Sequence, residues 1–83
     1  MTDEKLKSRC DAAVTSAALL MHTDGASLSM ILDRLLTYSL AQMCAVDGSP
    51  KTAANLRIMA DKIDRGAFHR VTGENHANNG VRH

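Results

Sequence analysis

The side chains in this sequence that could do chemistry are four histidines, two cysteines and scattered carboxylates. Histidines that bind a metal on a helix are spaced three or four residues apart, or have cysteine partners at short spacing. Neither pattern occurs, because the histidines are His22, His69, His76 and His83. We interpret them as surface residues, and we expect neither a metal nor another cofactor.

The acidic residues do not form a recognisable catalytic pair. General acid–base catalysis usually needs two titratable groups that converge in a cleft. The candidates Glu4, Asp33, Asp61 and Asp64 lie on predicted helix faces that are solvated. The motifs GxGxxG, GxxxxGK[ST], HExxH and CxxC are also absent from the chain. We therefore expect a protein that is not an enzyme.

The two cysteines, Cys10 and Cys44, are too few and too far apart for the disulfide framework of a small secreted protein. No residue near either one would activate a thiol, so we expect reduced, packed side chains, with Cys44 the more exposed. The charged N-terminus does not lead into a signal sequence, and no run of 18 apolar residues could span a membrane. These features favour a cytoplasmic protein without membrane contact.

The elements that would position these residues are helices. The chain contains twelve Ala, nine Leu and five Met, against one Phe, one Tyr and no Trp. Ala, Leu and Met favour helices, and the residues typical of strands are few. Three features predict the helix bounds: apolar periodicity, glycines that follow the helix ends, and residues suited to cap the helix starts. The candidate N-caps are Thr2 or Asp3, Asp24 or Ser27, and Ser49 before Pro50. The prediction is an all-α domain over residues 1–71, with three helices at about 3–22, 27–46 and 50–65, a possible short turn at 67–71, and a disordered polar tail at 72–83.

The segment 28–46 organises the prediction. Its apolar side chains cover an arc of roughly 180°, which is wider than the stripe of a surface helix. A chain this short, with few aromatic residues, also needs stabilisation beyond its own core. We therefore expect a homodimeric helical bundle, whose core or dimer interface includes Leu28, Ile31, Leu32, Leu35, Leu36, Leu40 and Met43.

Four apolar residues fall outside the predicted core faces. They are Leu19 on the first helix, Met30 on the second, and Ala54 and Ile58 on the third. Apolar residues that gather on a surface are typical of sites that another protein covers. We predict a small regulator of bacterial or phage type that occludes the working surface of a larger protein, as anti-activators and inhibitors do.

Two other functions remain open. The helix at 50–65 follows a short Gly-containing turn, which is the outline of a helix-turn-helix DNA-binding protein. Lys51, Asn55, Arg57 and Lys62 would then contact DNA, although the formal net charge of only +1 is low for that role. The third possibility is a structural subunit of a larger complex.

Overall fold

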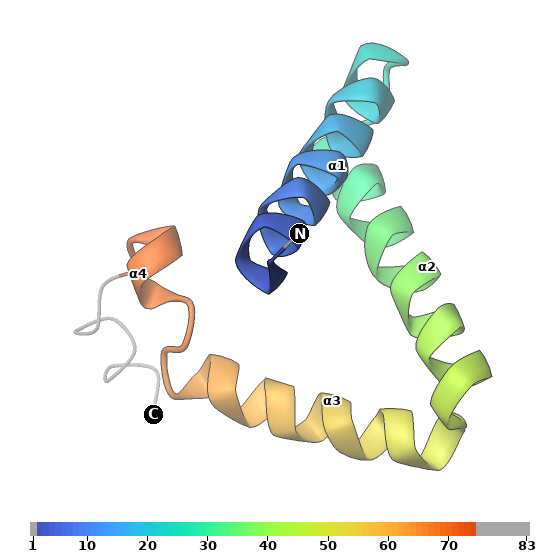
Figure 1. The fold of residues 1–83 in the computed structure, drawn as a ribbon, viewed down its shortest axis with the longest axis vertical. Helices are drawn as coiled ribbons and strands as arrows, with labels where there is room; N and C mark the ends of the chain where they lie inside the picture. Colours follow the sequence, from blue (N-terminus) through green and yellow to red (C-terminus); the bar gives the residue numbers. More distant parts are fainter. Residues whose placement is uncertain (1, 75–83) are drawn as a thin grey trace. The chain divides into compact units, whose positions relative to one another are not determined.

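The computed structural model describes residues 2–74 of the 83-residue chain. Within that range the protein is helical and contains no strand. The helices are α1 (Asp3–Thr23), α2 (Leu28–Asp47), α3 (Ser49–Asp64) and the short α4 (His69–Thr72) (Figure 1). The all-α class and the three main helices are therefore confirmed. Thr72, the first residue of the predicted tail, ends α4, and residues 75–83 lie outside the described residues.

Side-chain caps begin the first two helices. The Thr2 hydroxyl accepts a hydrogen bond of 3.2 Å from the Lys5 amide, and Asp3 and Glu4 lie in the first turn, at the positive end of the helix dipole. The Ser27 hydroxyl accepts a 3.1 Å bond from the Met30 amide. Of the predicted alternatives, Thr2 and Ser27 are the residues that cap.

The turn between α1 and α2 is closed by a Schellman motif. Gly25 has a φ of 101° and donates to the His22 carbonyl, while the Ala26 amide donates to the Met21 carbonyl, each at 3.0 Å. Only glycine adopts such a φ without strain, which explains why the helix ends here. The short turn brings the start of α2 beside α1.

The connection between α2 and α3 is Gly48 alone. Its amide donates to the Cys44 carbonyl at 2.9 Å, and its carbonyl accepts from the Thr52 amide at 3.1 Å. We predicted Ser49 as the cap of α3, and this was wrong: the N-cap is Gly48, and no side chain caps the helix. The physical reason is the backbone at Gly48, whose φ of 87° and ψ of 153° are almost exclusive to glycine.

The described residues divide into two compact units, and the division falls within α2, between Ala41 and Gln42. In the first unit Ile31 is 3% exposed, and Ala18, Met21 and Leu35 are half-buried. In the second unit Thr52 is 2% exposed near the Gly48 corner. Ile31 and Thr52 are the buried residues of the described chain, so each unit has a very small core.

The side of α1 that meets α2 differs from the one that periodicity favours. Leu6, Val14 and Leu20 lie on one side of α1, and apolar periodicity favours burial of that side, but these side chains are 52–63% exposed. The helix approaches α2 with Ala18 and its neighbours instead. Ala18 is small and therefore allows a close approach, and the Schellman turn fixes which side of the last turns points toward α2.

Candidate binding surfaces

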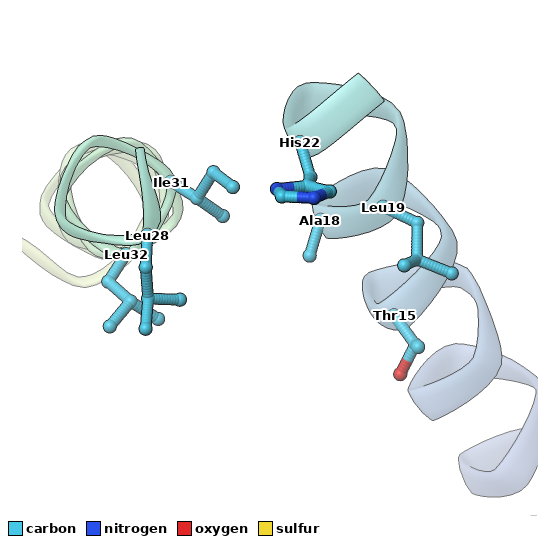
Figure 2. Close-up of a pocket in the computed structure, with 7 residues that line it drawn as sticks. All are labelled: Thr15, Ala18, Leu19, His22, Leu28, Ile31 and Leu32. Atoms are coloured by element: carbon cyan, nitrogen blue, oxygen red, sulfur yellow. The ribbon is translucent and has the colours of Figure 1, made fainter. Parts of the chain in front are cut away.

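The first unit contains an apolar groove between α1 and α2. Its volume is about 240 Å³. Figure 2 shows the seven residues that line it: Thr15, Ala18, Leu19, His22, Leu28, Ile31 and Leu32. Ile31 is directed from α2 across the groove toward His22 and Ala18 on α1. The buried core residue of this unit is thus also part of the groove wall.

The rim of the groove is formed by exposed leucines from both helices. Leu19 of α1 is 60% exposed, and Leu28 and Leu32 of α2 are 69% and 57% exposed. In Figure 2 all three side chains are directed to the same side of the helix pair. The structure therefore brings Leu19, a predicted protein-binding residue, together with two residues predicted for the core or dimer interface.

Sequence reasoning missed the contribution of Thr15, Ala18 and His22. These residues and Leu19 follow the spacing i, i+3, i+4, i+7, which marks one face of a helix. The signal was present, but the larger apolar residues of the neighbouring stripe concealed it. Met30 does not line the groove, since it lies about 160° around α2 from Leu32.

The remaining predicted interface residues of α2 differ in burial. Leu35, Leu40 and Met43 are half-buried, whereas Leu36 is 58% exposed. Leu28, Leu32 and Leu36 are spaced four residues apart and form one continuous exposed ridge. An apolar ridge of this length on a water-exposed helix is the kind of feature that an interface covers.

The second unit presents a mixed face along α3. Lys51, Ala54, Asn55, Ile58 and Lys62 fall within an arc of about 100° and are all exposed. This arc contains both predicted protein-binding residues of the helix and three of the four predicted DNA-contacting residues. Ile58, which is 56% exposed, is its large apolar member.

Arg57 does not belong to this face. It is about 120° around the helix from Lys51, so the four predicted DNA contacts do not act from one side. At the end of α3, Arg65 Nε pairs with a carboxylate oxygen of Asp61 at 3.1 Å, although both side chains are largely exposed. The connection before α3 is also one residue long, whereas a helix-turn-helix usually has a turn of about three or four residues.

The side chains that could bind a metal or take part in catalysis are scattered in the described part of the chain. No three His, Cys, Asp or Glu side chains there lie close enough to hold a metal ion. Both cysteines are free thiols, and Cys10 is exposed whereas Cys44 is half-buried. The prediction that Cys44 is the more exposed was wrong: Cys44 lies in the last turns of α2, next to the Gly48 corner, whereas Cys10 lies on an exposed side of α1. Across residues 2–74, every helix is too short or too polar to traverse a lipid bilayer.

Comparisons with protein-family models, curated proteins and solved structures find no match to this chain.

Proposed function

We propose that this protein is a small non-enzymatic regulator that binds another protein and occludes part of its surface. The observation that carries the proposal is the distribution of apolar side chains. Among the described residues, large apolar side chains with exposed fractions of 44% or more occur on every helix, whereas Ile31 is the buried one. Isolated apolar residues on a surface are normal. A chain in which exposed large apolar side chains far outnumber buried ones, however, has apolar surface available for partners.

Burial of the exposed apolar side chains by a partner protein would be energetically favourable. Complete burial of a large apolar side chain contributes about 1.5–3 kcal/mol, and helices in proteins are stabilised mainly by packing of their apolar faces. Neither unit supplies that packing from within itself. A partner that covers several of these side chains would stabilise the helices and gain affinity from the same contacts.

The face of α3 indicates the chemistry of the partner. Ile58 provides an apolar centre, and Lys51 and Lys62, which have no ion-pair partner among the described residues, flank it along the helix. Arg and Lys at the edge of an interface select partners of opposite charge. We therefore expect the regulated protein to present an apolar groove or helix with acidic residues beside it.

Capture of the partner by the full chain tests this proposal. The tagged protein and the variant Ile58→Asp are used to capture proteins from an extract of the source cells, and the bound proteins are quantified by mass spectrometry. We expect one partner whose capture falls at least about tenfold with Ile58→Asp, because a carboxylate replaces the central apolar contact.

The matched control is Ala60→Asp. Ala60 is also exposed in the middle of α3, two residues from Ile58 and about 160° around the helix, and the substitution adds the same charge. Equal capture by the wild type and both variants would contradict the assignment of this face. Circular dichroism of each variant establishes that the helices are retained.

DNA binding is the second candidate, because Lys51, Asn55 and Lys62 share the same exposed face. If DNA is the partner, affinity for random duplex should fall steeply with salt, with a slope that decreases when Lys51→Ala and Lys62→Ala are combined. Ile58→Asp should then act mainly through its charge. Protein binding through Ile58 should change little with salt, so a titration at two salt concentrations separates the two functions.

A further inference from the structure

We draw no further inference here: the strongest candidate, the apolar groove between α1 and α2 with its exposed rim of Leu19, Leu28 and Leu32, is an unpartnered apolar face, and nothing in the structure shows what covers it.

Discussion

Replacement of Ile31 with aspartate is expected to unfold the first unit. Ile31 is 3% exposed and is the buried apolar residue of the described chain. Truncation to alanine should lower the free energy of unfolding by about 2–5 kcal/mol. Aspartate adds the penalty of a carboxylate without an ion-pair partner in an apolar environment. Since a domain of this size rarely has more than about 3–5 kcal/mol of stability, the aspartate variant should lose most of its helical signal.

A graded series measures this effect. Urea unfolding at one fixed protein concentration, followed by circular dichroism, should give losses of about 1 kcal/mol for Ile31→Val and 2–5 kcal/mol for Ile31→Ala. Val46→Ala is the control, because Val46 is 80% exposed and surface changes usually stay within about 0.5 kcal/mol. Similar losses for Ile31→Ala and Val46→Ala would show that Ile31 is not the core of this unit.

The second large effect is expected at the corner between α2 and α3. Gly48→Ala should lower the free energy of unfolding by about 1–3 kcal/mol, because a φ of 87° with a ψ of 153° is almost closed to residues that have a Cβ. The loss would come from the backbone alone, since nothing lies within 4 Å of the position that a Cβ would occupy. Urea unfolding of the purified variants measures it.

Gly73→Ala provides the matched comparison. Gly73 also has open space where a Cβ would lie, but its φ of 74° and ψ of 17° are in the left-handed region that other residues visit. It also follows the short α4, so its loss should be clearly smaller than that of Gly48→Ala. The interpretation of the corner would be refuted by equal losses, which would mean that Gly48 relaxes into an ordinary conformation.

The helices could be predicted because their ends are determined by local chemistry. Ser27 caps α2 through its own hydroxyl, and Gly25 ends α1 through a backbone conformation that depends on neighbouring residues only. At Gly48 the same reasoning gave the wrong cap. Ser49 has the preferred side chain, but the change of direction between α2 and α3 occurs one residue earlier, at the positive φ of Gly48. Local preferences compete, and the backbone requirement prevailed.

The binding surfaces were only partly predictable. Periodicity places Leu19 on a face of its helix, but it does not say which neighbouring helix that face meets. On α1 the strongly apolar face with Leu6 and Val14 lies next to a less apolar face with Ala18. The start of α2 packs against the face with Ala18. On α3 periodicity was sufficient to show that Arg57 lies apart from Lys51, because that relation is fixed within a single helix.

The division of the chain inside α2 has a consequence for dissecting the protein. Ala41 and Gln42 are consecutive residues of one continuous helix, although they belong to different compact units. A fragment that ends at this point would expose unpaired carbonyl groups in mid-helix, and its complement would begin with unpaired amides. Compactness in space and separability along the chain are therefore different properties here. Gly48 is the more useful fragment boundary, because the helical ladder of α2 already ends there and the packing of α1 against Ile31 is kept.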